Sequence, residues 1–237
     1  MIIAPPGDRA AVSVRIPVAV MLITVLGLLW MLAISTLPGD AASGWIGYWG
    51  FRPSEMGGEL RRLGAGEFPP GLLRLCSALL VHATWLHLLG NLAYLWVFGP
   101  TVERALGTLG FLLVFALLGA VANLAVVLQL PEMDRVVVGA SGGISAIMGL
   151  YLGLYPSRRI GLWLPLGLFL QFARIPALLV IGSWFTLQLM FSAFGSTNGA
   201  VAWWTHVAGF VAGVVAAAVL RLIASLRRRS RWPMPQG

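Results

Sequence analysis

Six long apolar runs, separated by segments rich in arginine, constrain this chain more than any other feature. A helix needs about 20 apolar residues to cross the hydrocarbon core of a bilayer. The runs lie at about residues 16–37, 78–98, 109–130, 141–155, 176–194 and 202–223. Charged residues make up only 10% of the 237 residues, whereas about 25% is usual in soluble domains. We therefore expect an all-α integral membrane protein with six transmembrane helices.

Arginines predict how these spans are oriented. They precede the first run, follow the fourth and close the chain, and arginine collects in short cytoplasmic segments. We expect both termini to be cytoplasmic, with a tail over residues 1–15, a six-helix domain over 16–223 and a basic tail over 224–237. A bacterial inner membrane is the expected location, because every basic residue is arginine and no targeting segment is found. The residues concerned are Arg9, Arg15, Arg158, Arg159, Arg221, Arg227, Arg228, Arg229 and Arg231.

The net charge of +8 does not indicate nucleic-acid binding, because no basic patch interleaved with aromatic residues is present. Two connecting segments stand out instead. Residues 39–77 are long and of mixed charge, which predicts an outer loop that partly dips into the membrane interface. Residues 160–174 are apolar but broken by Pro165 and two glycines. That composition predicts either an interfacial segment or an irregular start to the fifth helix.

The few polar residues within the apolar runs are the strongest functional signal, since placing them in lipid is costly. The three histidines, His82, His87 and His206, all fall in predicted spans, and no Asp or Glu is expected in the middle of one. This pattern excludes an intramembrane aspartyl protease, which needs two carboxylates that share a proton. It also excludes a zinc protease with a His-Glu-x-x-His motif. We expect neither a metal nor a cofactor.

A glycine-rich motif around Ser141 begins the fourth predicted span. The flanking Gly139 and Gly142 permit a tight turn and close helix packing. The positive end of the helix dipole would stabilise an oxyanion that forms beside Ser141. Small residues at this spacing are also a common packing face in membrane helices. The motif alone therefore leaves both interpretations open.

The sixth predicted span carries His206 with Gly209 and Gly213 on the same face. Those glycines would let a partner helix approach closely. Taken alone, the motif is equally consistent with a histidine that simply hydrogen-bonds a neighbouring helix.

The second predicted span carries His87 and Asn91 four residues apart, and therefore on one helix face. Both side chains can donate hydrogen bonds, which suits an oxyanion hole, although a polar clamp between helices would use the same residues. His82 lies about 140° around the same predicted helix from His87, so the two histidines form no obvious metal pair.

The three motifs are predicted to lie at one depth in the membrane. Ser141 and His206 are each about 15 residues, or roughly 22 Å, from the cytoplasmic ends of their helices, and His87 is about 14 residues, or roughly 21 Å. Unrelated packing residues would have no reason to coincide in this way. We therefore expect one site, in which His206 takes the proton from Ser141. Because no carboxylate is available to orient the histidine, the expected arrangement is a Ser–His dyad that water reaches from the outer side.

Four motifs occur in a characteristic order: His82-Ala-Thr-Trp-Leu-His87-Leu-Leu-Gly-Asn91, Val102-Glu103-Arg104-Ala-Leu-Gly107, Gly139-Ala-Ser141-Gly142 and Ala202-Trp-Trp-Thr-His206-Val-Ala-Gly209-Phe210-Val-Ala-Gly213. On these motifs the chain resembles the rhomboid family of intramembrane serine proteases, over about residues 74–221. The resemblance implies a rhomboid-like six-helix bundle with Ser141 as the nucleophile and His206 as the base. It implies an oxyanion hole formed by Asn91, His87 and the Ser141 backbone N–H.

The resemblance also implies an activity. Members of the family are serine endopeptidases that cut membrane-anchored protein substrates in or near their transmembrane segments, without a cofactor. Substrates would enter past the fifth helix and the outer cap near residues 195–200. The glycines of the motifs would support the site by close packing: Gly139, Gly142, Gly209 and Gly213.

The chain departs from the family pattern at two positions. Leu73 precedes Arg74 where many members have tryptophan, and Ser145 stands where many have an aromatic residue packed against the histidine. The departure at Ser145 means that the orientation of His206 must depend on some other group.

Two other functions are considered. A non-catalytic protein of the same fold could bind client spans, but it would have no need to retain Ser141, His206 and Asn91. An unrelated transporter or channel is disfavoured by the lack of intramembrane carboxylates and of paired half-helices. The sequence leaves the oligomeric state open.

Overall fold

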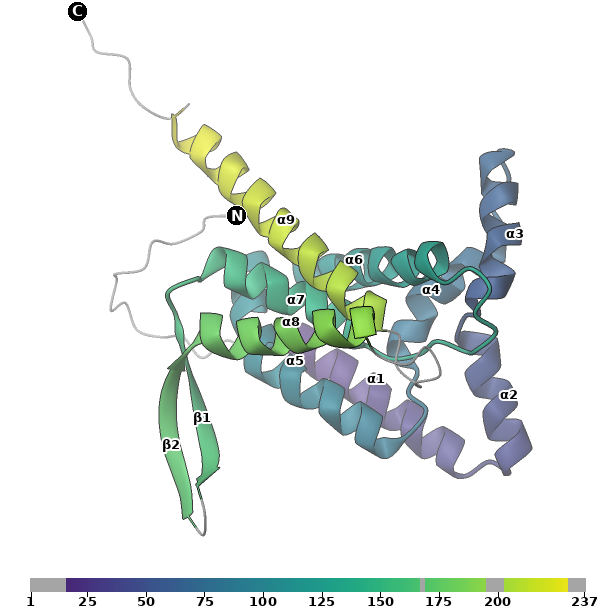
Figure 1. Ribbon diagram of the computed structural model, residues 1–237, viewed down its shortest axis with the longest axis horizontal. Coiled ribbons are helices and arrows are strands. Elements are labelled where there is room, and N and C mark those ends of the chain that lie inside the picture. The colour runs from purple at the N-terminus through teal and green to yellow at the C-terminus, as the bar shows by residue number, and fades with distance from the viewer. Residues whose placement is uncertain (1–15, 167–168, 195–202, 230–237) are drawn as a thin grey trace, which may run out of the picture.

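The structure, a computed structural model, describes residues 16–166, 169–194 and 203–229. Figure 1 shows a bundle of helices from which a two-stranded hairpin projects at one end. The predicted N-terminal tail over residues 1–15 and the last part of the predicted C-terminal tail, residues 230–237, lie outside the described residues. The elements in chain order are α1 (Val18–Ser35), α2 (Gly39–Trp49), α3 (Pro53–Gly64), η1 (Pro70–Leu73), α4 (Arg74–Ser77), η2 (Ala78–Leu80), α5 (Trp85–Leu106), α6 (Thr108–Gln129), α7 (Ser141–Leu154), β1 (Arg159–Leu166), β2 (Phe169–Pro176), α8 (Ala177–Phe194) and α9 (Trp203–Arg229).

Helix α7 forms the centre of the bundle. Every residue from Gly142 to Tyr151 is buried, and the helix packs against α5, α6, α8 and α9. A helix can be surrounded in this way only when its side chains are small or apolar, which the run of Gly, Ala, Ser, Ile and Met provides. Helix α1 covers α5 and α6 on the far side. The main apolar core lies between α1, α5, α6, α7, α8 and α9.

A helix is present at each of the six predicted apolar runs. Among the described residues, three of them, α1, α6 and α9, are long and apolar enough to cross a membrane. The segment Pro70–Leu80 together with α5 is a fourth candidate, with a bend of 81° between the two parts. Helices α7 and α8 are apolar but shorter. The positions of the helices are therefore confirmed, whereas the count of six spans stays a prediction.

The predicted start of the second span is wrong. The helix begins at Trp85 and not at Ala78, because Thr84 caps it and its hydroxyl accepts a hydrogen bond from the His87 backbone N–H at 3.2 Å. His82 therefore lies in the extended segment before α5. The rings of His82 and His87 are 5.2 Å apart and meet edge to face, so the angle predicted from a continuous helix does not apply.

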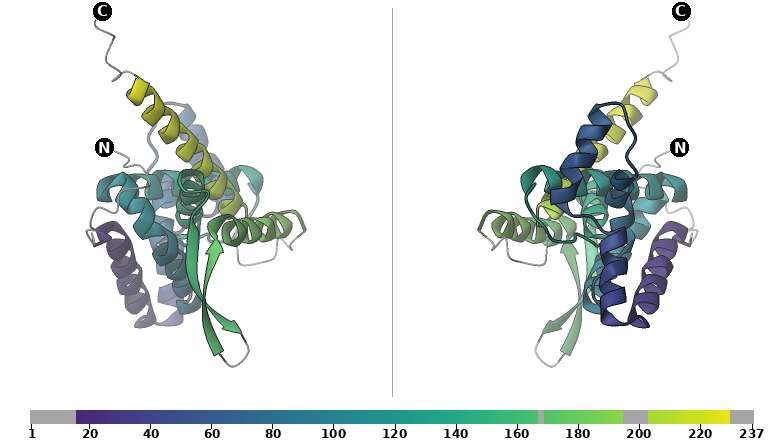
Figure 2. Two further views of the ribbon diagram at one scale, coloured as in Figure 1. Left: turned by 90° about the vertical axis from the view of Figure 1, so that its left-hand side faces the viewer. Right: turned by 90° about the vertical axis from the view of Figure 1, so that its right-hand side faces the viewer.

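The all-α prediction is wrong at residues 159–176. Strands β1 and β2 pair as an antiparallel hairpin, from Arg159 opposite Pro176 to Leu166 opposite Phe169. Figure 2 shows that the hairpin projects from the bundle. Helix α8 begins directly after β2, which rules out an irregular helical start. The predicted interfacial position of this segment stays a prediction.

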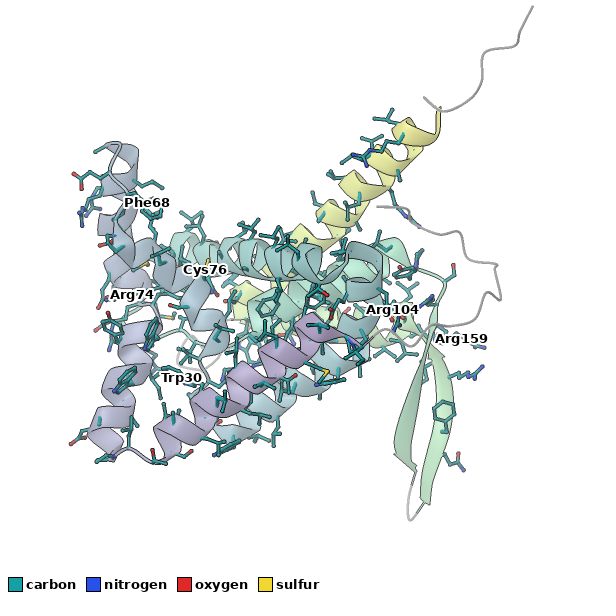
Figure 3. The ribbon with its side chains drawn as sticks, turned by 180° about the vertical axis from the view of Figure 1, so that it is seen from behind. Trp30, Phe68, Arg74, Cys76, Arg104 and Arg159 are labelled. Atoms are coloured by element: carbon teal, nitrogen blue, oxygen red, sulfur yellow. The ribbon has the colours of Figure 1, made fainter. Side chains whose placement is uncertain are left out.

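The long first loop folds as α2, α3, η1 and α4 at the opposite end of the bundle from the hairpin (Figure 1). Figure 3 shows Phe68 and Arg74 at this end and Arg104 and Arg159 at the other. Arg74 forms an ion pair of 3.2 Å with Glu55 and lies over the ring of Tyr48. The neighbouring Leu73, where a tryptophan is common, is exposed.

Helices α1, α5 and α6 are joined by a buried carboxylate. Glu103 is 4% exposed and accepts hydrogen bonds from the backbone N–H groups of Ala19, at 2.8 Å, and Val20, at 3.1 Å. It also accepts from the Thr108 hydroxyl at 2.9 Å. The first N–H groups of a helix lack partners within the helix, so Glu103 serves as the missing cap of α1. Gly107, with φ of +74°, makes the sharp turn that lets α6 follow directly.

The predicted domain boundary at residue 223 falls inside α9, which continues without a break to Arg229. The basic residues at its end therefore extend the last helix. Figure 1 shows this part of α9 rising away from the other helices.

Candidate functional site

Ser141 is the first residue of α7, as the sequence predicts. The chain reaches it through Gly139, whose φ of +123° is one that residues with a side chain rarely adopt. Two backbone contacts fix this approach. The Gly139 N–H donates to Ala78 at 2.8 Å, and Val137 pairs in both directions with Phe51 of the outer loop, at 2.7 and 3.2 Å. The turn before the serine is thus held by residues from distant parts of the chain.

The side chains of His87 and Asn91 lie against this turn. A Cβ atom at Gly139 would lie 2.7 Å from the His87 ring and 3.7 Å from the Asn91 amide nitrogen, so only glycine leaves room for them. The Nδ2 of Asn91 is buried and has no hydrogen-bond partner among the described residues. A buried donor without a partner is costly. It is expected where a ligand atom completes the arrangement.

His82 also contacts the turn before Ser141. Its Nε2 accepts a hydrogen bond of 3.4 Å from the backbone N–H of Ala140. A small enclosed cavity next to this bond is lined by residues of α1, α5 and the start of α7, including His82, Asn91, Ala140 and Ile144. His87 and Asn91 thus lie at the turn before Ser141, and their role as an oxyanion hole stays a prediction. His82 adds a contact that the sequence did not indicate.

Helix α9 brings His206 to α7 through very close backbone packing. A Cβ at Gly209 would meet the carbonyl of Gly142, and one at Gly213 would meet the carbonyl of Ala146. One turn before Gly209 on α9, the Thr205 methyl group lies 2.6 Å from the position of a Cβ at Gly142. Gly209 of one motif thus lies against Gly142 of the other, whereas Gly213 lies against Ala146 and Gly139 against His87. His206 is buried beside them, with 9% of its surface exposed.

Ser145 lies within the same packing. Its Oγ donates to the Ser141 carbonyl at 2.6 Å, and its Cβ lies 3.2 Å from the position of a Cβ at Gly209. An aromatic ring at this position would separate the two helices, so the small residue is what allows their contact here. Nothing on α7 therefore stacks on His206.

Helix α8 supplies the groups that surround His206 instead. Gln188 is 7% exposed, and its Oε1 lies 2.8 Å from the His206 Nδ1. One turn earlier on α8, the Trp184 ring lies 6.1 Å from the His206 ring. At the start of α9, Trp203 meets the His206 ring edge to face at 5.8 Å. Trp184 also contacts Tyr94 of α5, at 6.2 Å between ring centres.

The sequence reasoning missed Gln188. The signal was present, because a lone amide in an apolar run is a polar group in a costly place. The predicted outer cap near residues 195–200 lies outside the described residues, so its part in the site is not tested.

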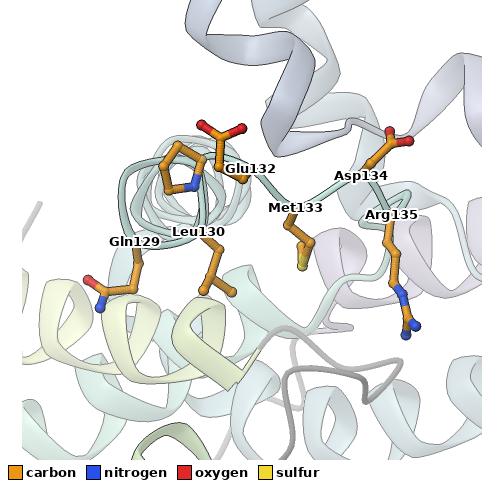
Figure 4. Close-up of a pocket in the computed structure, with 7 residues that line it drawn as sticks. Gln129, Leu130, Glu132, Met133, Asp134 and Arg135 are labelled. Atoms are coloured by element: carbon orange, nitrogen blue, oxygen red, sulfur yellow. The ribbon is translucent and has the colours of Figure 1, made fainter.

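A wider hollow lies over the connection between α6 and α7 (Figure 4). It is lined by residues from Gln129 to Arg135 and includes none of the predicted site residues. Its open rim of charged side chains is typical of an exposed loop. The site is better defined by the buried groups around Ser141.

Comparison with known proteins agrees with this arrangement. Residues 69–223, more than half of the chain, match the family model of the Rhomboid domain. The chain therefore belongs to the rhomboid family. The family and the apolar helices together identify an integral membrane protein that crosses the bilayer several times.

Two relatives are similar over part of their length. A Bacillus subtilis (strain 168) protein named rhomboid protease YdcA is 43% identical over 79 residues, which is 33% of this chain and 39% of the relative. Rhomboid-like protein 11, chloroplastic, of Arabidopsis thaliana is 40% identical over 82 residues, which is 35% of this chain and 28% of the relative. The chain thus aligns with less than half of either relative.

Proposed function

We propose that this protein is an intramembrane serine endopeptidase. It hydrolyses peptide bonds in or near the transmembrane segments of membrane-anchored protein substrates through a dyad of Ser141 and His206. The observation that carries the proposal is the buried Nδ2 of Asn91, which has no partner among the described residues and lies beside the glycine turn before Ser141. A packing serine would need no such donor, whereas an oxyanion formed at Ser141 does.

The residues suggest the steps of the reaction. Ser141 Oγ attacks the carbonyl carbon of the scissile bond and passes its proton to His206 Nε2. Negative charge develops on the carbonyl oxygen, where Asn91, His87 and the Ser141 backbone N–H can donate to it. His206 then returns the proton to the leaving amine as the C–N bond breaks. A water molecule, deprotonated by His206, hydrolyses the remaining ester and restores the serine.

The proposal includes six spans and two cytoplasmic termini in a bacterial inner membrane. Helices at all six apolar runs and the arginines at both ends of the chain support it. Tyr94 and Trp184 join α5 to α8 next to His206, which supports α8 as the wall through which a substrate span approaches. The name of the Bacillus subtilis relative supports a protease, although the alignment covers only 39% of that relative.

The test is covalent labelling of the purified protein in detergent with a fluorophosphonate, which reacts with activated serines. Wild type should be labelled, whereas Ser141→Ala and His206→Ala should not, with all three samples shown to be folded by their thermal transitions. The variant Ser183→Ala is a matched control, because this serine on α8 is exposed and hydrogen-bonds only locally. It should be labelled like wild type.

A folded wild-type protein that is not labelled would overturn the proposal. It would favour a non-catalytic rhomboid-like protein that binds client spans. Cleavage of a membrane-anchored substrate that persists in Ser141→Ala would equally exclude Ser141 as the nucleophile.

A further inference from the structure

We infer that Gln188 is a positioning residue for His206, so that α8, the proposed wall through which substrates approach, also orients the base of the dyad. This inference rests on the proposed function, because it assigns the group that orients the base of that dyad. The dyad would then operate as a Ser–His–Gln arrangement whose third member comes from a peripheral helix.

The contact is short and buried on both sides. Gln188 Oε1 and His206 Nδ1 are 2.8 Å apart, and the two side chains are 7% and 9% exposed. Trp184 lies one helical turn before Gln188 and therefore on the same face of α8. Its ring is also near His206. Helix α8 thus offers His206 both a hydrogen-bond partner and a ring.

The chemistry of the dyad determines which way this hydrogen bond runs. Nε2 must be unprotonated if it is to take the proton from Ser141, so in the neutral ring Nδ1 carries the hydrogen. Nδ1–H can then donate to the Gln188 carbonyl oxygen. A histidine base is usually held in this tautomer by a carboxylate, which also stabilises the imidazolium that forms. A neutral carbonyl supplies the same orientation with a weaker electrostatic effect.

The surroundings of His206 leave this role to α8. Ser145 is too small to stack on the ring and its hydroxyl is used by the Ser141 carbonyl. Helices α6 and α8 carry no ionisable side chain along their length, and the one on α7, Tyr151, packs against Phe98 near the other end of the helix. On α5 the histidine at the site is His87, whose ring contacts that of His82.

The position of Gln188 on α8 also bears on how a substrate reaches the site. Substrate entry requires α8 to move relative to α5, and any such movement carries Gln188 with it. The base is then fully oriented only when α8 has returned. The outward movement of α8 and the transfer of the Ser141 proton to His206 could therefore not occur at the same time.

The test measures the rate of fluorophosphonate labelling of the full-length protein as a function of pH for Gln188→Met, Gln188→Asn and Gln188→Glu. Met has nearly the same shape without an acceptor, so labelling should slow by about 10- to 100-fold at its optimum. Asn keeps an acceptor that is one carbon too short, so it should resemble Met. Glu restores the acceptor and should recover most of the rate. Its carboxylate also favours the imidazolium, which should move the acidic limb of the profile by about one unit towards higher pH.

Gln129→Met is the matched control, because this glutamine ends α6 and is exposed. It should leave both rate and profile unchanged. A purely structural role for Gln188 would lower the thermal transition of the variants without moving the pH profile of Gln188→Glu. That result, or labelling of Gln188→Met at the wild-type rate, would overturn the inference. Both outcomes differ from failure of the proposed function, in which wild type itself would not be labelled.

Discussion

The helix pair that carries Ser141 and His206 is built differently from the helix that covers it. Helices α7 and α9 touch backbone to backbone, since a Cβ at Gly149 would meet the carbonyl of Phe210 and one at Gly153 would meet Ala217. Helix α8 has few buried side chains, and a Cβ at Gly182 would meet nothing within 4 Å. Its contacts with the bundle are made by side chains: Ala177 and Ile181 enter the main core, and the closest aromatic contact is the stack of Phe185 on Phe210 at 4.3 Å.

This difference assigns distinct tasks to the two regions. Close backbone contact leaves little freedom of movement, so the relative position of Ser141 and His206 is set by the packing of α7 against α9. Side-chain contact at the edge can be broken and remade at low cost. A protease that admits a transmembrane helix needs both properties, because the reacting groups must stay aligned while one wall opens.

The strongest test of the rigid region, which is the helix pair α7 and α9, is Gly149→Ala. The added methyl group has no space against the Phe210 carbonyl, so α7 and α9 must separate. We expect a loss of about 2 to 4 kcal/mol in the free energy of unfolding. Denaturant titration of the detergent-solubilised protein measures this, with fluorophosphonate labelling as a second readout. Wild-type stability in this variant would show that the two backbones are not in contact.

Removal of the buried Glu103 carboxylate tests whether the rigid region extends to α1. Glu103→Ala leaves the N–H groups of Ala19 and Val20 without partners in a buried place. We expect a loss of about 1 to 3 kcal/mol in the free energy of unfolding. The control is Glu67→Ala, which removes an exposed carboxylate paired with Arg62 at 2.8 Å and should cost at most about 1 kcal/mol. Equal effects would place Glu103 outside the rigid region.

Cross-linking α5 to α8 tests whether the covering helix must open. In the Cys76→Ser background, Tyr94→Cys and Trp184→Cys introduce two thiols where the rings now meet. Bridging them with a bifunctional methanethiosulfonate should slow cleavage of a membrane-anchored substrate by about tenfold, relative to the same sample after reduction. Labelling by the small probe should change little. Unchanged cleavage after complete cross-linking would mean that substrates enter elsewhere.

The smallest effect is expected at Gly182. A methyl group at this position of α8 meets no other atom, and alanine favours the helix over glycine. Gly182→Ala should therefore raise the free energy of unfolding by at most about 1 kcal/mol, as followed by denaturant titration. A clear loss of stability would indicate that α8 is packed as tightly as α7, which would remove the contrast between the two regions.

Most of the helices could be predicted from the sequence, because a long apolar run in a chain with few charges has few alternatives. The hairpin at residues 159–176 could not. Its strands are apolar at successive positions, so the period-two alternation that identifies a strand is hidden. The start of α5 was missed because hydropathy outweighed Thr84, a residue type that favours helix starts.

The sequence indicated individual residues of the candidate site but not every contact between them. Ser141, His87 and Asn91 could be placed together from motif and depth, and the structure gathers the latter two at the turn before the serine. The contact of Gln188 with His206 depends on how α8 lies against α9, which no spacing within either helix specifies. Glu103 belongs to one of the motifs, but its contact with the start of α1 could not be predicted, because an acidic residue near the end of a helix is usually solvated.

The contacts that close the turn before Ser141 also bear on the order of folding. Ala140 meets His82 across 58 residues of chain, and Val137 meets Phe51 across a still longer stretch. Contacts between residues so distant in the chain form late, because the entropy of closing the loop comes before any gain. Until then Ser141 sits at a bare helix end, away from the donors of α5. If Ser141 is the nucleophile, as proposed, the order of folding itself would delay hydrolysis until the outer loop has docked.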